Sequence, residues 1–257
     1  MLNKIFKKRV LFLAYDQGLE HGPTDFNDKN IDPKYILNIA EKGKYAGIIF
    51  QKGIAEKYYN KKKNKTPLIV KLNGKTNLIK GDPISPQLCT VKEAISLGAK
   101  AVGYTIYPGS IHEAKMFKEF EKIEREAHKN NLPVIAWMYP RGKAIKNELD
   151  KEILAYSARI GLELGADIIK MKYNNNPKDL KWIIKCAGKT KVVISGGTKT
   201  NPKLLLQQTK DIINSGAIGL AIGRNVWQYK EPLKITKALK SIIFKNKSVN
   251  EALKYLK

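Results

Sequence analysis

The amino-acid sequence predicts an α/β protein folded as a single TIM (β/α)8 barrel. Short runs rich in β-branched residues alternate along the chain with segments whose apolar residues have helical spacing. Eight such strand–helix units fit into 257 residues, the usual size of one barrel. No linker or low-complexity stretch divides the chain, so we expect one barrel domain over residues 1–257.

The predicted strands follow one another at fairly regular intervals, at residues 10–16, 47–51, 68–72, 101–106, 134–137, 166–172, 191–195 and 219–222. The segments between them include predicted helices at residues 35–42, 111–130, 151–164 and 202–215. Several helices end in Leu-Gly-Ala or Ser-Gly-Ala, where glycine suits the helix C-cap before the next strand. Residues 54–65 are expected to form an insertion, and residues 73–90 a surface loop.

A doubly wound open sheet is the alternative architecture. Such a sheet is expected to show a Gly-x-Gly-x-x-Gly loop after its first strand. This chain has Asp16-Gln17-Gly18-Leu19-Glu20-His21-Gly22 at that place instead. The barrel is therefore the favoured prediction.

The chain is strongly basic, with a formal net charge of +25. A basic nucleic-acid-binding protein is therefore one alternative function. The positive residues are mostly lysines spread over the whole chain, and only five are arginines, the residue preferred for bidentate contacts to bases and phosphates. We expect no nucleic-acid partner, although the charge would attract anionic small molecules.

Other sequence features concern location. No apolar run reaches the roughly 18 residues of a membrane helix, so no membrane partner is expected. The apolar run at 10–15, after basic residues 7–9, is too short for a secretory signal and lacks a cleavage site. Cys89 and Cys186 form no Cys-x-x-Cys motif. A reduced protein of the cytoplasm is the simplest interpretation.

Lys170 lies within a run that is predicted to be a buried strand. Burial and nearby cations lower the pKa of a lysine and supply the free amine that attacks a carbonyl. Lys172 shares the same strand face, so either lysine could be the nucleophile and the other the cation that lowers its pKa. The alternative is a lysine paired with a carboxylate such as Asp16. Spacing alone does not choose between Lys170 and Lys172.

Ser195-Gly196-Gly197 and Gly223-Arg224 follow the seventh and eighth predicted strands. The loops after these strands form the usual phosphate site of a TIM barrel. Glycines there let backbone N–H groups approach an anion, and Arg224 would clamp the phosphate oxygens. The alternative is that both segments are only tight strand-to-helix turns.

Trp137, Tyr139 and Arg141 lie at the end of the fifth predicted strand. Tyr139 is a candidate general acid/base if nearby lysines lower its pKa from about 10. Trp137 would wall the pocket and exclude water, although both aromatics could simply fill the top of the barrel. Asp16 could hold substrate hydroxyls or an iminium, or could cap a helix, and His21 could meet a second phosphate. With three histidines and none paired at ligand spacing, no metal site is expected.

These segments resemble archaeal-type class I fructose-1,6-bisphosphate aldolases, TIM-barrel enzymes that act through a lysine Schiff base. The resemblance runs through nearly the whole chain. It is strongest at residues 13–23, 50–59, 71–76 and 103–110 and in the Trp-x-Tyr-Pro-Arg-Gly, Ser-Gly-Gly and Gly-Arg-Asn-Val-Trp-Gln segments.

The resemblance implies roles for individual residues. Lys170 lies 31 positions after Tyr139, as in the family pattern, which selects it over Lys172 as the Schiff-base lysine. Tyr139 matches the family's acid/base tyrosine. Gln17 is a departure, because better-known relatives often have histidine there, and it is kept as an expected substrate contact. The other implied substrate contacts are Asp16, His21, Asp25, Trp137 and Arg141, with Ser195, Gly196, Gly197, Gly223 and Arg224 at a phosphate.

The implied reaction is the reversible cleavage of fructose 1,6-bisphosphate to dihydroxyacetone phosphate and glyceraldehyde 3-phosphate. It needs no metal and no cofactor beyond the covalent Schiff base on Lys170, and it serves glycolysis or gluconeogenesis. The resemblance also implies a homo-oligomer, of which a decamer is one form. The alternative enzyme is 2-amino-3,7-dideoxy-D-threo-hept-6-ulosonate synthase of aromatic amino acid biosynthesis, which shares the barrel, the lysine and the tyrosine. The loop 18–22 favours the aldolase, because a serine/asparagine-type loop is expected in the synthase.

Overall fold

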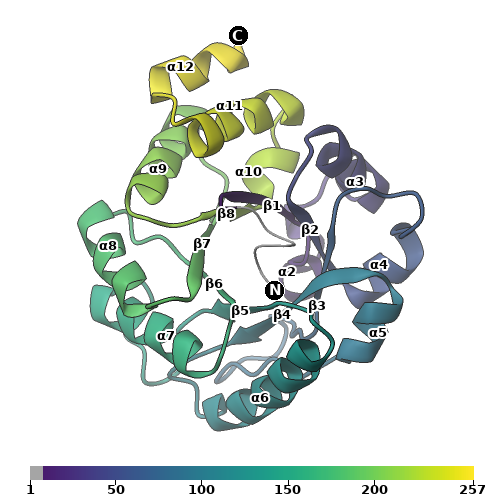
Figure 1. The fold of residues 1–257 in the computed structure, drawn as a ribbon, viewed down its shortest axis with the longest axis vertical. Coiled ribbons are helices and arrows are strands. Elements are labelled where there is room, and N and C mark those ends of the chain that lie inside the picture. The colour runs from purple at the N-terminus through teal and green to yellow at the C-terminus, as the bar shows by residue number, and fades with distance from the viewer. Residues whose placement is uncertain (1–7) are drawn as a thin grey trace.

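The computed structural model describes residues 8–257, and residues 1–7 of the expected domain lie outside the described residues. Eight parallel strands form one closed barrel in the order of the sequence, with helices around it (Figure 1). The barrel closes between β1 and β8, where Val10 lies opposite Gly219. The predicted TIM barrel is therefore confirmed, and the open sheet is excluded.

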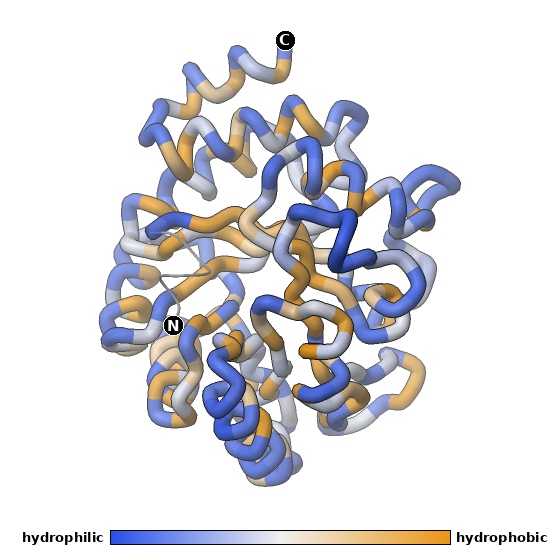
Figure 2. The backbone as a smooth tube through the Cα atoms, turned by 45° about the vertical axis from the view of Figure 1, so that its right-hand side comes forward, coloured by the Kyte–Doolittle hydropathy of each residue, from blue (hydrophilic) through white to orange (hydrophobic). Residues whose placement is uncertain are grey.

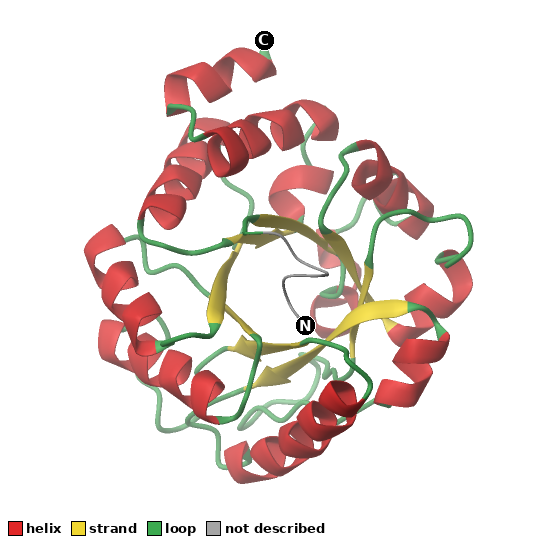
Figure 3. Cartoon of the chain, viewed as in Figure 1, coloured by secondary structure: helices red, strands yellow, loops and turns green. Residues whose placement is uncertain are grey.

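All eight predicted strands are present, with ends that differ from the predicted ones by at most a few residues. Figure 3 shows them as an inner ring enclosed by helices. The strands are β1 (Val10–Ala14), β2 (Gly47–Gln51), β3 (Leu68–Lys71), β4 (Ala99–Ile106), β5 (Val134–Met138), β6 (Ile168–Met171), β7 (Lys191–Ser195) and β8 (Gly219–Ile222).

The helices cover the outside of the barrel and also extend some of the loops. They are α2 (Gly18–His21), α3 (Pro33–Lys42), α4 (Lys52–Tyr58), α5 (Val91–Ser96), α6 (Glu113–Lys129), α7 (Lys151–Glu163), α8 (Pro177–Cys186), α9 (Pro202–Asn214), α10 (Arg224–Trp227), α11 (Pro232–Lys245) and α12 (Val249–Leu253), with 3-10 turns η1 (Gly22–Asp25) and η2 (Lys254–Leu256).

The segment 54–65 is not the insertion that the sequence suggested. Its first five residues, 54–58, belong to α4, the helix that follows β2 in the regular strand–helix alternation, and residues 59–65 form the loop that leads to β3. This helix has only seven residues, and Ala55 is its single buried residue. A helix this short shows too little apolar periodicity to be recognised in the sequence.

Local sequence explains where several helices begin and end. The helices α3, α8 and α9 each begin with an Asp or Asn cap followed by proline, and the cap side chain accepts from a backbone N–H of the first turn. The predicted glycine stops are also present. Gly98, Gly165 and Gly216 all have positive φ values, which glycine adopts without steric cost.

The apolar residues form two layers that the barrel wall separates. The inner layer fills the barrel with alternate strand residues such as Val10, Phe12 and Ile168. The larger outer layer packs the other face of the strands against the helices. Figure 2 shows the strands as mainly hydrophobic segments inside a hydrophilic periphery. A packed interior of this kind leaves the ends of the strands as the place for a binding site.

Candidate active site

The inward-facing apolar residues of the barrel are followed, two positions later, by the side chains of the candidate site. Because side chains alternate along a strand, residues two apart point to the same side. The inner layer therefore continues at the carboxyl ends of the strands as a second set of inward-facing residues. The successive pairs are Ala14 and Asp16, Ile69 and Lys71, Ile135 and Trp137, Ile168 and Lys170, Val193 and Ser195, and Ala221 and Gly223.

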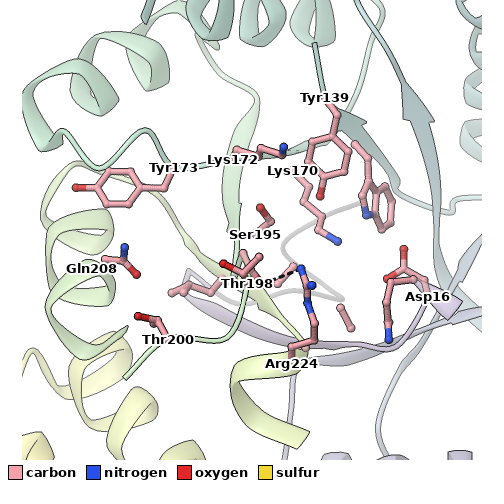
Figure 4. A pocket seen from close by; sticks show the side chains of 18 of the residues that line it. Asp16, Tyr139, Lys170, Lys172, Tyr173, Ser195, Thr198, Thr200, Gln208 and Arg224 are labelled. Atoms are coloured by element: carbon pink, nitrogen blue, oxygen red, sulfur yellow. Dashed lines mark hydrogen bonds between the residues drawn. The ribbon is translucent and has the colours of Figure 1, made fainter. Parts of the chain in front are cut away.

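These residues surround an open cavity of about 730 Å³ at the carboxyl ends of the strands. All the predicted site residues except Asp25 line it. In Figure 4 the Lys170 side chain extends between Tyr139 and Asp16, with Arg224 projecting from the other side. The polar and aromatic residues that the sequence placed after separate strands are thus brought together in one site.

Lys170 is a buried lysine without a fixed partner. Its side chain is only 5% exposed, and within residues 8–257 its ammonium forms no hydrogen bond or ion pair. Nζ lies 4.8 Å from the centre of the Trp137 ring. Burial lowers the pKa of Lys170 to about 8, with Lys71 acting in the same direction and Asp16 opposing it. At neutral pH a useful fraction of the amine is therefore unprotonated and able to attack a carbonyl.

The cation that lowers the pKa of Lys170 is Lys71 on β3, and not Lys172 as one sequence hypothesis had it. Lys172 lines the same cavity, but its ammonium pairs with Glu148. Lys71 is only 6% exposed and faces the barrel interior from the opposite wall. The sequence missed its role because only the fold brings β3 and β6 together across the barrel.

Asp16 is the buried carboxylate between the two inner lysines. It forms an ion pair with Lys71 at 3.3 Å. Burial would raise the pKa of Asp16, but Lys170 and Lys71 together lower it, so Asp16 is ionised. The sequence alternative, in which Lys170 or Lys172 pairs with a carboxylate such as Asp16, does not hold for Lys170 among the described residues, whereas Lys172 pairs with Glu148. Asp16 is also placed to stabilise a positive charge that forms at Lys170.

Trp137 lies beside Lys170 on the neighbouring strand, and a glycine makes room for its ring. A Cβ atom on Gly103 of β4 would lie 1.7 Å from the Trp137 ring, so only glycine fits there. The indole Nε1–H of Trp137 and the side-chain amide nitrogen of Gln17 are buried and have no hydrogen-bond partner in the described part of the chain. Both residues line the cavity.

Tyr139 has a raised pKa, and not the lowered one that the sequence hypothesis required. Burial is the main cause and the Asp16 charge adds to it, whereas a hydrogen bond with Ser195 and the Arg141 charge act against them. No lysine has the expected lowering effect. In the ligand-free site Tyr139 is therefore a neutral phenol, which can donate a proton and can act as a base only when a positive charge appears nearby.

Asn225 determines the shape of the loop after β7. Its side-chain amide donates to the carbonyl oxygens of Gly196 and Thr198, both at 2.8 Å, and its Oδ1 accepts from the Thr200 N–H at 2.9 Å. The N–H groups of Gly197 and Thr198 have no hydrogen-bond partner among the residues described. Gly197 has a φ of 64°, the conformation that glycine favours. Free N–H groups on a glycine turn are suited to binding a phosphate.

Arg224 adds a charge to this loop. Its guanidinium donates to the carbonyl oxygen of Gly197 at 3.2 Å and to Asp25 at 3.3 Å. Asp25 also bonds to His21 Nδ1 at 2.7 Å. Asp25 therefore lies behind the cavity and orients two residues that line it. Through Asp25, His21 is linked to Arg224, and its contact with a second phosphate stays a prediction.

Several residues of the site were not singled out from the sequence. Besides Lys71 and Asn225, they include Glu20 and Glu148, which pair with Arg141 at 2.9 Å and 3.2 Å. Glu20 lies in the four-residue helix α2 and Glu148 in a loop, and neither segment has a periodicity that shows which way a side chain points. For Lys71 the sequence does contain a signal. Lys71 follows the apolar Ile69 by two residues on a predicted strand, so the two side chains are expected to point to the same side.

Residues 8–257 contain neither a membrane-spanning helix nor a cluster of metal ligands. None of their helices is both long and apolar enough to span a membrane. No three or more His, Cys, Asp or Glu side chains in the described part of the chain are grouped so that they could hold a metal ion.

Comparison with known proteins finds close relatives over the whole chain. The chain is 50% identical over 255 residues to a fructose-bisphosphate aldolase class 1 of Thermoproteus tenax, covering 97% of this chain and 96% of that protein. It is 41% identical to a fructose-bisphosphate aldolase/6-deoxy-5-ketofructose 1-phosphate synthase of Methanocaldococcus jannaschii, covering 95% of this chain and 84% of that one.

A solved structure gives the same result. An archaeal fructose-1,6-bisphosphate aldolase, with its catalytic lysine covalently bound to the carbinolamine intermediate of the substrate, matches with a TM-score of 0.91 and 49% identity. The match covers 94% of this chain and 97% of that structure. The family model described as DeoC/LacD family aldolase matches residues 10–229. The chain therefore belongs to the DeoC/LacD family of aldolases.

Proposed function

We propose that this protein is a class I fructose-1,6-bisphosphate aldolase, an aldehyde-lyase in which Lys170 forms the Schiff base. The main observation in favour is the buried Lys170, unpaired among the described residues and with its pKa lowered to about 8, beside a phosphate-type loop and a tyrosine. A free amine in a cavity otherwise built for anions is what carbonyl attack on a sugar phosphate requires. Relatives named fructose-bisphosphate aldolase class 1 match this chain over nearly its full length.

The substrate would be bound by its two phosphates. The C1 phosphate, which is nearer the carbonyl, would lie on the N–H groups of the 195–198 loop and Gly223, with Arg224 neutralising its charge. Arg141 would face the C6 phosphate, since it lies on the other side of Lys170. Asp16, Gln17 and Trp137 would contact the hydroxyl groups between the phosphates. The two phosphates then fix the position of C2 relative to Lys170.

The reaction follows from this placement. The Lys170 amine attacks C2, and loss of water gives an iminium. Tyr139 removes the proton of the C4 hydroxyl, the C3–C4 bond breaks, and its electrons flow into the iminium to give an enamine. Glyceraldehyde 3-phosphate leaves. Protonation of the enamine at C3 and hydrolysis of the iminium then release dihydroxyacetone phosphate and restore the amine.

The charges of the site match these steps. The iminium places a positive charge beside Asp16, which is already ionised. The same charge lowers the pKa of the nearby Tyr139, which is raised in the free site. Tyr139 would thus become a base only after the Schiff base has formed. This order prevents the phenolate from existing before the substrate is bound.

We also propose that the chain acts as one barrel domain in a cytoplasmic homo-oligomer, without nucleic-acid or membrane partners, in glycolysis or gluconeogenesis. The regular barrel and the family membership support the domain and the pathway. A monomer in light scattering at micromolar concentration would contradict the oligomer.

The test is borohydride trapping with fructose 1,6-bisphosphate in the presence of EDTA, followed by peptide mass spectrometry. We expect a triose-phosphate adduct on the peptide that contains Lys170, and none in the Lys170→Ala variant. An adduct on Lys172 would keep the reaction class and overturn the assignment. Absence of both adduct and cleavage would reject the aldolase and would favour the heptulosonate synthase as the next enzyme to test.

A further inference from the structure

A chain of alternating charges crosses the cavity mouth on the side away from Arg224. Lys172 pairs with one oxygen of Glu148, and the other Glu148 oxygen accepts from Arg141 Nε at 3.2 Å. Arg141 also donates from its NH1 group to Glu20 at 2.9 Å. The chain thus connects the loops that follow β1, β5 and β6.

Arg141 is held in one orientation within this chain. Its guanidinium carbon lies 5.6 Å from the centre of the Tyr107 ring and 5.9 Å from that of Tyr139. The Nε and NH1 groups are bonded to the two carboxylates, and within residues 8–257 the NH2 group has no partner. An arginine fixed in this way presents its remaining donors in a defined direction.

Glu148 joins Arg141 and Lys172, which both line the cavity, whereas the second cation on Glu20 is Lys75, at 4.0 Å and outside the cavity lining. The hydrogen bond from Lys172 and the charge of Arg141 lower its pKa against the effect of burial, so the carboxylate is ionised. Glu148 itself does not line the cavity, whereas Arg141 and Lys172 do. Its negative charge therefore lies behind two cations that face the ligand. Figure 4 shows Lys172 and Arg224 on opposite sides of the Lys170 side chain.

We propose that Glu148 is a positioning residue that holds Arg141 and Lys172 as a joint subsite for the second phosphate, and so sets the preference for a bisphosphate over a monophosphate. This inference rests on the proposed aldolase function. A carboxylate can accept from both cations at once, whereas a glutamine has one acceptor oxygen and must turn its NH2 group towards one of them. The Glu148→Gln variant keeps the size of the side chain and removes one acceptor. It therefore distinguishes a positioning role from simple space filling.

The obvious alternative is a surface ion pair with a purely structural role. The Glu148 side chain is 39% exposed, and ion pairs this exposed contribute little to stability. Its replacement should leave the fold intact, so kinetic effects can be interpreted. A purely structural role would also lower kcat/KM for every substrate alike. The proposal instead predicts a loss for the bisphosphate alone.

The experiment compares Glu148→Gln with the wild type on fructose 1,6-bisphosphate and fructose 1-phosphate, which lacks the second phosphate. We expect kcat/KM for the bisphosphate to fall roughly 10- to 100-fold, mainly through KM. The value for fructose 1-phosphate should not change. The matched control is Glu152→Gln, an exposed carboxylate on α7 whose only ion pair among residues 8–257 is with its neighbour Lys151, and it should behave as wild type on both substrates.

Borohydride trapping with dihydroxyacetone phosphate provides a second reference, because this ligand never uses the second subsite. The yield of adduct on Lys170 should be equal in Glu148→Gln and wild type. Equal losses on both sugars would overturn the proposal, and so would a lower KM for the bisphosphate, which would make Glu148 a competitor of the phosphate. Failure of the wild type itself to be trapped would reject the aldolase function instead.

Discussion

The two ends of the barrel both contain buried or half-buried charged clusters, and they use them differently. At the amino-terminal end of the strands, His128 on α6 bonds to Glu124 at 2.7 Å and to Asp167 at 2.8 Å. Asp167 also accepts from the backbone N–H of Val134 at 2.8 Å. At the carboxyl end, Asp16 pairs with Lys71, while Lys170 beside them has no such bond to another described residue.

The difference shows what separates a stabilising cluster from a reactive one. Around His128 each charged group is bonded to another, so the cluster connects α6 to the starts of β5 and β6. At the mouth the two inner lysines, Lys71 and Lys170, face one carboxylate, Asp16, and this leaves the Lys170 amine desolvated. Lys170 is thereby a cost to folding below pH 8, and that cost falls as the pH rises from about 8 towards the ordinary value for lysine. We expect mutations at the mouth to change chemistry and mutations at the other end to change stability.

The largest expected effect is that of Tyr139→Phe, which removes the proposed base and keeps the ring. Loss of a positioned proton transfer should lower kcat for cleavage by about 10²- to 10⁴-fold. Formation of the Schiff base should persist, because Lys170 is unchanged. Single-turnover cleavage and borohydride trapping measure the two steps separately.

The matched control for this variant is Tyr107→Phe. Tyr107 also contacts Arg141, and its ring contact should survive the loss of the hydroxyl group. This control should cleave nearly as fast as the wild type. If Tyr139→Phe lost trapping as completely as cleavage, the tyrosine would act before carbon–carbon cleavage, and the proposed order of steps would be wrong.

The second prediction concerns the pH dependence of Lys170 at the mouth of the barrel. In Lys71→Met, Asp16 faces Lys170 alone, so the pKa of Lys170 should rise from about 8 towards its ordinary value. The amine is reactive only when unprotonated, and a rise of one pKa unit lowers its free fraction about tenfold at pH 7. The pH profile of the trapping rate should shift to higher pH by about that amount.

Lys71→Arg is the control, because it keeps the positive charge beside Asp16. Its trapping profile should stay close to that of the wild type. An unshifted profile in Lys71→Met would mean that burial alone sets the reactivity of Lys170, and that the two lysines at the mouth act independently.

Most of the fold was predictable from the sequence because its signals are local. Apolar β-branched runs marked all eight strands, and glycines such as Gly98 and Gly165 marked the helix ends. The short helix α4 was missed, since seven residues with one buried side chain give almost no periodic pattern. Closure of the barrel was inferred from the number of units, and no single residue encodes it.

The candidate site was predictable where a residue follows a strand and less so where its role depends on partners. Lys170, Trp137 and Ser195 were placed by strand alternation alone. The effects of Lys71 on Lys170 and of burial on Tyr139 were not, because both depend on distances across the barrel. A pKa depends on the three-dimensional surroundings of a group, which residue spacing does not describe.

The smallest effect is expected at the opposite end of the barrel. His128→Ala removes a hydrogen bond to Asp167 and an ion-pair contact with Glu124 from a side chain that is 32% exposed, so the free energy of unfolding should fall by only about 1 kcal/mol. Asp167 retains its bond from Val134, and no residue of the mouth moves, so kcat/KM should not change. Urea denaturation and steady-state cleavage on the same preparation measure both quantities. A loss of activity without a loss of stability would show that the two ends of the barrel are coupled. It would contradict the view that the His128 cluster only stabilises the fold and that the mouth alone carries the chemistry.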